Sequence, residues 1–137
     1  MDSTNARDRV RRNETMATFC DPPRNMLYKP VNHLKQIDAT LWYEQNPEKI
    51  CGLARIVSVP VKFGVKPMLE VEKEIIDFLF ELSLLCKIAS AVIFRFRDGK
   101  LYYWRIENPN ALKYENSMKR GKSYTTYQLP IQNLKAI

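Results

Sequence analysis

The distribution of apolar residues predicts two strands near the middle of the chain. Residues 39–43 (ATLWY) and 53–63 (LARIVSVPVKF) are rich in apolar and β-branched side chains, and the polar stretch between them contains Asn46-Pro47, a turn signal. We therefore expect a β-hairpin here. Pro60 cannot donate a hydrogen bond to a neighbouring strand, so the second strand should reach an edge, a bulge or its end at that position.

A second hairpin is predicted from a central Asp-Gly pair. Residues 90–96 (SAVIFRF) and 101–106 (LYYWRI) flank a turn centred on Asp98-Gly99, which suits the type I′ geometry of a tight hairpin. Residues 123–129 (SYTTYQL) predict a further strand, and the proline that follows them favours the start of a short terminal helix.

The longest apolar segment predicts a helix over residues 68–87. Pro67 suits the start of a helix, and the acidic residues after it favour the positive end of the helix dipole. Apolar side chains occur on more than one face of this helix, at Val71, Ile75, Ile76, Phe78, Leu79, Phe80, Leu82, Leu84 and Leu85. We therefore expect a sheet to cover one side and a second copy of the chain to cover the other, which predicts a homodimer.

Together these elements predict a single α/β (α+β) domain over residues 19–137, with a mixed central β-sheet, one long buried helix and short peripheral helices. Residues 1–18 are polar and Arg-rich, without the apolar run of a signal peptide, so we expect a flexible arm. The prolines of residues 20–36 predict a mostly irregular segment, in which residues 26–28 pair as a short edge strand.

The composition argues against several classes of protein. Three widely spaced cysteines without a secretory leader indicate free thiols in a reducing compartment, which predicts a cytoplasmic protein. Charged residues interrupt the apolar segment 75–96, so no membrane span is expected. With one histidine, His33, and no glycine-rich loop, the chain lacks the pattern of a Cys/His zinc site or a P-loop, and no cofactor is expected.

The positive charge is concentrated in the last third of the chain. Of the formal net charge of +7, residues 95–137 contribute +6, from nine basic and three acidic residues. Aromatic residues are interleaved with these cations, a combination suited to phosphates, bases and sugars. We therefore expect a nucleic acid, DNA in the first instance, to contact Arg95, Arg97, Lys100, Arg105, Lys119, Arg120, Lys122 and Tyr124. A structural interpretation stays open, in which the aromatic residues fill a β core and the cations face water.

The order of elements (strand, strand, long helix, strand, Asp-Gly turn, strand, loop, strand) resembles the restriction-endonuclease-like fold over about residues 36–134. Within that fold it is similar to archaeal-type Holliday junction resolvases. The resemblance lies in residues 36–39 (QIDA), where the family has an aspartate that opens a strand, and in WRI followed by a loop and SYTTYQL, where it has its last strands. It implies a divalent-metal site in which Asp38 is a ligand and Lys62 helps to position the attacking water.

One departure from the family pattern bears on catalysis. The residue two positions before Lys62 is Pro60, where the family carries a second acid, and proline has no carboxylate for Mg²⁺. We therefore expect a nucleic-acid-binding protein that has lost metal-dependent cleavage; an active endonuclease with Mg²⁺ is the alternative. Structural interpretations remain for both residues, with Asp38 capping nearby backbone amides and Lys62 at a solvated strand end.

Two further classes stay open. The layout also resembles small proteins of spherical viruses that infect hyperthermophilic archaea, which implies the host cytoplasm and a virion-associated or protein-interaction module. A winged-helix-like DNA binder would use the hairpin of residues 90–106 as its wing. A mixed sheet flanked by the long helix favours the nuclease-like fold, whereas a three-helix core favours the winged helix.

Overall fold

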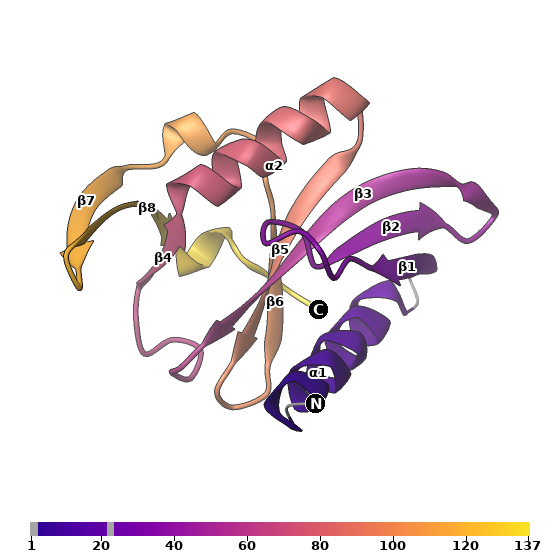
Figure 1. The fold of residues 1–137 in the computed structure, drawn as a ribbon, viewed down its shortest axis with the longest axis horizontal. Coiled ribbons are helices and arrows are strands. Elements are labelled where there is room, and N and C mark those ends of the chain that lie inside the picture. The colour runs from indigo at the N-terminus through magenta and orange to yellow at the C-terminus, as the bar shows by residue number, and fades with distance from the viewer. Residues whose placement is uncertain (1–2, 22–23) are drawn as a thin grey trace.

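The computed structural model describes residues 3–21 and 24–137, which form two β-sheets and two α-helices (Figure 1). Within these residues the larger sheet has six strands in the order β1-β2-β3-β5-β6-β9, and the smaller has three in the order β4-β8-β7. The combination of a mixed sheet with helices confirms the predicted α+β class.

The larger sheet is antiparallel except at its centre. Its strands are β1 (Met26–Pro30), β2 (Ala39–Tyr43), β3 (Asn46–Val59), β5 (Ala89–Phe96), β6 (Leu101–Arg105) and β9 (Lys135–Ala136). β3 and β5 run parallel, and the chain crosses from one to the other through a strand of the smaller sheet and a helix. Both predicted hairpins, β2–β3 and β5–β6, are confirmed, although the first turn is short because β3 already begins at Asn46. The type I′ turn predicted for the second hairpin is wrong, because that turn needs a positive φ at both central residues and Gly99 has one while Asp98 does not.

The smaller sheet contains β4 (Met68–Glu72), β7 (Tyr114–Lys119) and β8 (Lys122–Pro130). Helix α2 (Lys73–Cys86) directly follows β4, and the short 3₁₀ helices η1 (Pro109–Ala111) and η2 (Ile131–Asn133) precede β7 and β9. Within the described residues, neither α-helix combines the length and the apolar character that a membrane-spanning helix requires.

The helix predicted over residues 68–87 is confirmed only from Lys73 onward. Residues 68–72 form β4 instead, in which Leu69 and Val71 are buried and the residues on either side of them are exposed. This alternation has the two-residue period of a strand, and pairing with β8 along its whole length fixes it. α2 is also less buried than predicted, since Ile76 and Leu79 face the core while Leu84 and Leu85 are exposed.

The N-terminal segment differs from the flexible arm expected of it, because residues 3–20 form helix α1 (Ser3–Cys20). Met16, Phe19 and Cys20 follow one another at the three- and four-residue spacing of one helix face, and all three are buried against the larger sheet. Burial raises the pKa of Cys20 to about 11, so its thiol stays protonated and packs as a small apolar group. Residues 1–2 and 22–23 lie outside the described residues.

Alternate residues of β5 divide the core between the two faces of the larger sheet. Val92 and Phe94 pack on the side of α2 and the smaller sheet, in a cluster that includes Leu79. Ile93, between them in sequence, packs on the opposite side in a cluster with Met16 of α1. The larger sheet is therefore covered by α1 on one face and by α2 with the smaller sheet on the other.

A polar contact attaches α2 to the smaller sheet. The hydroxyl of Tyr127 on β8 donates a hydrogen bond to Asp77, whose other oxygen lies 2.7 Å from Lys73 Nζ. Burial, followed by the neighbouring Asp77 carboxylate, raises the pKa of Tyr127, so the phenol remains protonated and keeps its role as donor. This cluster holds the helix on the sheet.

Candidate functional site

One face of α1 changes from apolar to cationic along the helix axis. Met16, Phe19 and Cys20 pack on the larger sheet, and the same face continues toward the N-terminus through positions three and four residues apart. Those positions hold Thr15, Arg12, Arg11, Arg9 and Asp8. The helix therefore meets the sheet with apolar side chains at one end and carries arginines at the other.

The strand that α1 covers shows the same change of character. On the face of β5 that carries buried Ile93, the next residues are Arg95 and, just beyond the strand, Arg97. Ser58 of β3 is the register partner of Arg95. Because β3 and β5 are parallel, their carboxyl ends lie at one edge of the sheet, and the cationic ends of α1 and β5 meet there.

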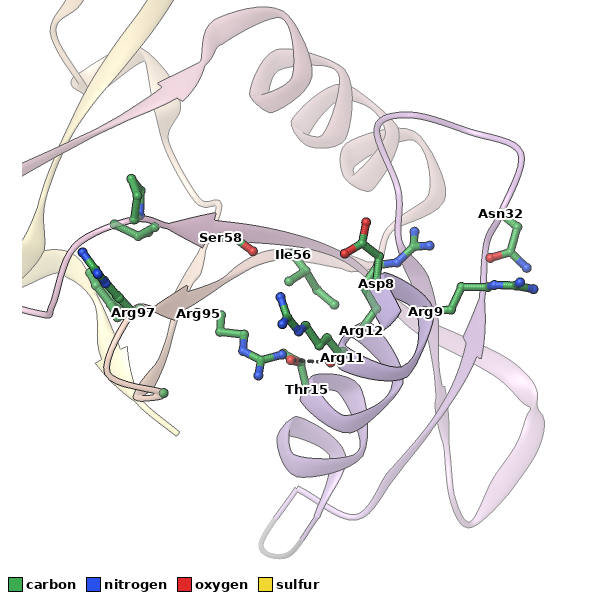
Figure 2. A pocket seen from close by; sticks show the side chains of 14 residues that line it. Asp8, Arg9, Arg11, Arg12, Thr15, Asn32, Ile56, Ser58, Arg95 and Arg97 are labelled. Carbon is green, nitrogen blue, oxygen red and sulfur yellow. Dashed lines mark hydrogen bonds between the residues drawn. The ribbon is translucent and has the colours of Figure 1, made fainter. Parts of the chain in front are cut away.

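A cavity of about 1000 Å³ lies where these two cationic ends meet (Figure 2). Its lining comes from residues 8–15 of α1, from Asn32 after β1, from the end of β3 and from the β5–β6 hairpin. Figure 2 shows arginine side chains of α1 on one side and those of the strand ends on the other. Two segments more than half the chain apart in sequence thus form one site.

The charge of the lining is strongly positive. It consists of five arginines and one aspartate, a formal excess of four positive charges: Arg9, Arg11, Arg12, Arg95, Arg97 and Asp8. In the described part of the chain, no carboxylate lies within ion-pair distance of Arg11, Arg95 or Arg97. Guanidinium groups gathered around one cavity repel one another and are stabilised when an anion enters. The lining therefore favours a ligand with several negative charges.

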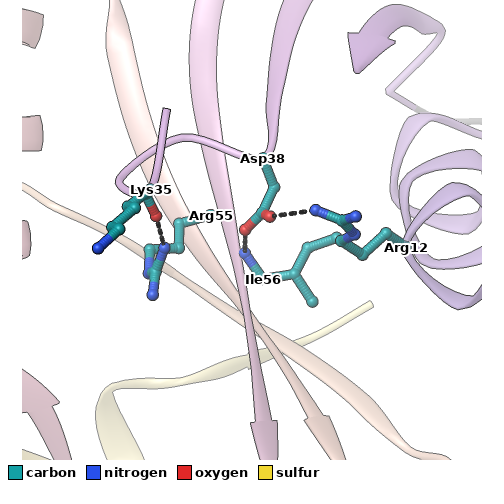
Figure 3. A network of polar contacts seen from close by, with 5 residues as sticks. All are labelled: Arg12, Lys35, Asp38, Arg55 and Ile56. Carbon is teal, nitrogen blue, oxygen red and sulfur yellow. Dashed lines mark hydrogen bonds and ion pairs between the residues drawn. The ribbon is translucent and has the colours of Figure 1, made fainter. Parts of the chain in front are cut away.

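Arg12 is held beside the cavity by Asp38, the candidate metal ligand (Figure 3). One oxygen of Asp38 lies 3.3 Å from Arg12 Nη1, and the other accepts a 2.7 Å hydrogen bond from the Ile56 backbone N–H. The Asp38 backbone N–H donates to the Ala54 carbonyl, and its own carbonyl accepts from the Val31 N–H, both at 2.9 Å. Asp38 thus caps a backbone amide, as its structural interpretation predicts, and joins α1 to β3.

Lys62 does not share a site with Asp38. It is exposed in the loop after β3 and lines neither the large cavity nor a smaller one of about 240 Å³ that includes Asp38. The residues present do not fit the Mg²⁺ site that the resemblance implies, because Pro60 replaces the second acid and both oxygens of Asp38 already have partners. Among the described residues, no three His, Cys, Asp or Glu side chains gather where they could hold a metal ion.

The residues expected to bind nucleic acid fall into two groups. Arg95 and Arg97 line the cavity, and Lys100 is exposed in the adjoining turn of the β5–β6 hairpin. Arg105 lies at the end of β6, where its guanidinium is 3.8 Å from the Glu107 carboxylate. Arg95 and Arg97 therefore lie with the arginines of α1 around the cavity. Arg105 pairs with Ala91 of β5 and lies at the opposite end of the hairpin, away from the cavity.

The second group belongs to the β7–β8 hairpin of the smaller sheet. Arg120 and Lys122 are exposed at its turn, and Tyr124 is exposed on β8; the side chain of Lys119 lies outside the described part of the chain. Figure 1 shows this hairpin and α1 at opposite sides of the molecule. The basic last third of the chain therefore contributes to two separate surfaces.

Three of the five arginines of the cavity, Arg9, Arg11 and Arg12, lie in the segment expected to be an arm. A signal for them exists in the helical spacing of Met16 and Phe19, which extends upstream to Arg12 and Arg9. That spacing predicts a helix with one mixed face, half apolar and half cationic.

Comparisons with protein-family models, with curated proteins and with solved structures find no match to this chain. The likeness to restriction-endonuclease-like proteins therefore stays a prediction from the order of the elements. Function has to be inferred from the geometry and charge of the cavity.

Proposed function

We propose that the protein binds nucleic acid and that phosphate groups occupy the arginine-lined cavity between α1 and the ends of β3 and β5. One observation carries the proposal: five arginines from two distant segments converge on one cavity against a single aspartate. Repulsion among these cations costs folding free energy, and a polyanionic ligand would offset it.

The identity of the cations supports an oxyanion ligand. Every basic residue of the lining is an arginine, although lysines are plentiful elsewhere in the chain. The planar guanidinium presents paired N–H donors that match two oxygens of a phosphate, and it is desolvated more easily than an ammonium group. A cavity lined by arginines therefore favours a ligand with phosphate groups over a ligand whose negative charge is spread over a wide surface.

The position of the cavity in the fold also supports ligand binding. Open α/β sheets bind ligands beyond the carboxyl ends of parallel strands, where backbone and side chains diverge from the regular ladder. Here Ser58 lies at the end of β3 and Arg95 at the end of β5, with Pro60 and Arg97 just beyond the strands, at the edge that borders the cavity. The rigid strands hold two of the arginines in place before a ligand arrives.

Binding should weaken steeply with salt. If all five arginines release counterions from single-stranded DNA, the logarithm of the association constant should fall with the logarithm of salt concentration at a slope of about −3.5. Fluorescence anisotropy of a labelled oligonucleotide, titrated between about 50 and 200 mM salt, measures that slope. No detectable binding at the lowest salt would contradict the proposed function.

We propose in addition that the chain forms a homodimer through the outer face of α2. Phe78, Leu84 and Leu85 are exposed there, Leu85 with 81% of its surface accessible to solvent. A two-fold contact would bring these apolar side chains of the two copies together, with the exposed Glu74 and Glu81 of the same helix beside them. Light scattering should show a dimer that Leu85→Glu converts to a monomer; a wild-type monomer at every concentration would contradict this.

A further inference from the structure

We infer that the cavity takes the phosphorylated end of a nucleic-acid strand, a terminal phosphomonoester, in preference to an internal phosphodiester. The inference rests on the proposed function and specifies the ligand of the same cavity. It follows from the density of charge in the cavity and from the kind of side chain that lines it.

The cavity is bounded on several sides. Toward the C-terminal end of α1 it stops at Thr15, which is buried, because from Met16 onward the helix packs directly on the sheet. Toward the strand ends it is bounded by the β5–β6 hairpin, which is joined to the loop after β3 by a 3.1 Å hydrogen bond from the Arg97 N–H to the Val61 carbonyl. The remaining sides are open to solvent, so a strand end can enter with its terminal phosphate among the arginines.

A third boundary is the ion pair of Arg12 with Asp38. This pair stands between the large cavity and the smaller one of about 240 Å³, which share Arg9, Arg12 and Asn32 in their linings. The carboxylate of Asp38 lines only the smaller cavity. A phosphate in the large cavity therefore meets the arginines from one side, while Asp38 holds Arg12 from the other.

The charge of the cavity exceeds what one internal phosphate supplies. A phosphodiester carries one negative charge and two free oxygens, whereas a terminal phosphomonoester carries about 1.5 to 2 negative charges near neutral pH and three acceptor oxygens. With Asp38 counted against its partner Arg12, the formal excess around the cavity is three positive charges, which matches the second group better than one phosphodiester. Paired guanidinium donors would also find more oxygens to bind on the monoester.

The lining offers no exposed aromatic ring for base stacking. Its only aromatic residue is Phe96, which is buried and packs against Phe63 and Tyr102 at ring distances of 5.3 and 5.6 Å. Recognition would therefore rest on the phosphate, with little preference for the base attached to it. At about 1000 Å³ the cavity is at the upper end of small-ligand pockets, about 300–1000 Å³, and is large enough for the terminal nucleotides of a strand.

The test compares single-stranded DNA oligonucleotides of one sequence with a 5′-phosphate, a 3′-phosphate or hydroxyls at both ends, together with a circular single strand of the same length. We expect at least one phosphorylated form to bind about tenfold more tightly than the hydroxyl and circular forms. Arg95→Ala with Arg97→Ala should remove this preference, while Arg120→Ala with Lys122→Ala, on the β7–β8 hairpin, should retain it. Circular dichroism of each variant checks that the fold persists.

A free nucleotide carries the same phosphomonoester, so adenosine monophosphate serves as a competitor. Competition weaker than that of an unlabelled phosphorylated oligonucleotide supports a strand end as the ligand. Tighter binding of the free nucleotide would overturn the inference in favour of a small-molecule site. Equal affinity for the phosphorylated, hydroxyl and circular strands would overturn it and leave nucleic-acid binding intact, whereas no binding to any strand would overturn the proposed function as well.

Discussion

Replacing Arg11, Arg95 and Arg97 together by alanine should weaken binding to single-stranded DNA by roughly 100-fold at low salt and reduce the magnitude of the salt slope by about 2. These three arginines come from both walls of the cavity, and none of them has a carboxylate within ion-pair distance among the described residues. Their removal therefore takes away phosphate contacts without breaking an ion pair that holds the fold together.

The matched control is the triple alanine variant of Lys113, Arg120 and Lys122. All three are exposed near or on the β7–β8 hairpin, away from the cavity, and the variant loses the same three positive charges. If attraction to the whole protein dominates, both variants will weaken to the same extent, and that result would contradict the assignment of binding to the cavity. Titrations at two salt concentrations separate the two cases.

Replacing Asp38 by alanine should lower the free energy of unfolding by about 2 kcal/mol. The Asp38 side chain is mostly buried, and its loss leaves the Ile56 N–H without its acceptor and Arg12 without its carboxylate. Asp38→Asn keeps an acceptor for Ile56 and should lose less than half as much. Urea unfolding monitored by fluorescence measures both changes.

The same substitutions should weaken nucleic-acid binding by about tenfold, although they make the protein more positive. Asp38 holds Arg12 in position at the cavity. Without Asp38, Arg12 loses conformational entropy when the ligand binds, and this loss lowers the affinity. Tighter binding by Asp38→Asn would contradict this role. Tighter binding by Asp38→Asn, together with Mg²⁺-dependent cleavage of DNA by the wild type but not by the variant, would favour the endonuclease alternative. We expect no such cleavage from the wild type, because both oxygens of Asp38 have partners and residue 60 is a proline.

The strands could be predicted from sequence because their signals are local. Asp98-Gly99 predicts a turn between the two apolar runs that flank it, and the nearly continuous apolar run of β5 is typical of a strand buried on both faces. The boundary between β4 and α2 is harder, because Val71 and Ile75 are four residues apart, as on a helix face, while Leu69 and Val71 have the two-residue spacing of a strand. Pairing with β8, whose partner residues lie 54 to 62 positions downstream, decides it.

For a similar reason, the sequence predicts the arginines at the end of β5 as binding residues but not the arginines of α1. Arg95 and Arg97 stand out next to an evident strand, whereas the arginines of α1 belong to a helix with a short apolar stripe. What makes α1 a helix is the sheet beneath Met16 and Phe19, which no local pattern reveals. The basic residues of the two surfaces follow one another in the sequence without a break. They lie on separate surfaces because β7 and β8 belong to the second sheet.

The division of the cavity between the first 15 residues and the strand ends sets the order in which it is completed during synthesis. α1 leaves the ribosome several seconds before β5 at ordinary rates of translation, so its arginines face solvent without their counterparts. Met16 and Phe19 likewise stay exposed until Ile93 of β5 has been synthesised and can pack against them. A nascent chain therefore gains its complete binding cavity only after Gly99 has been made, and it can bind the ligand only once the central sheet has formed.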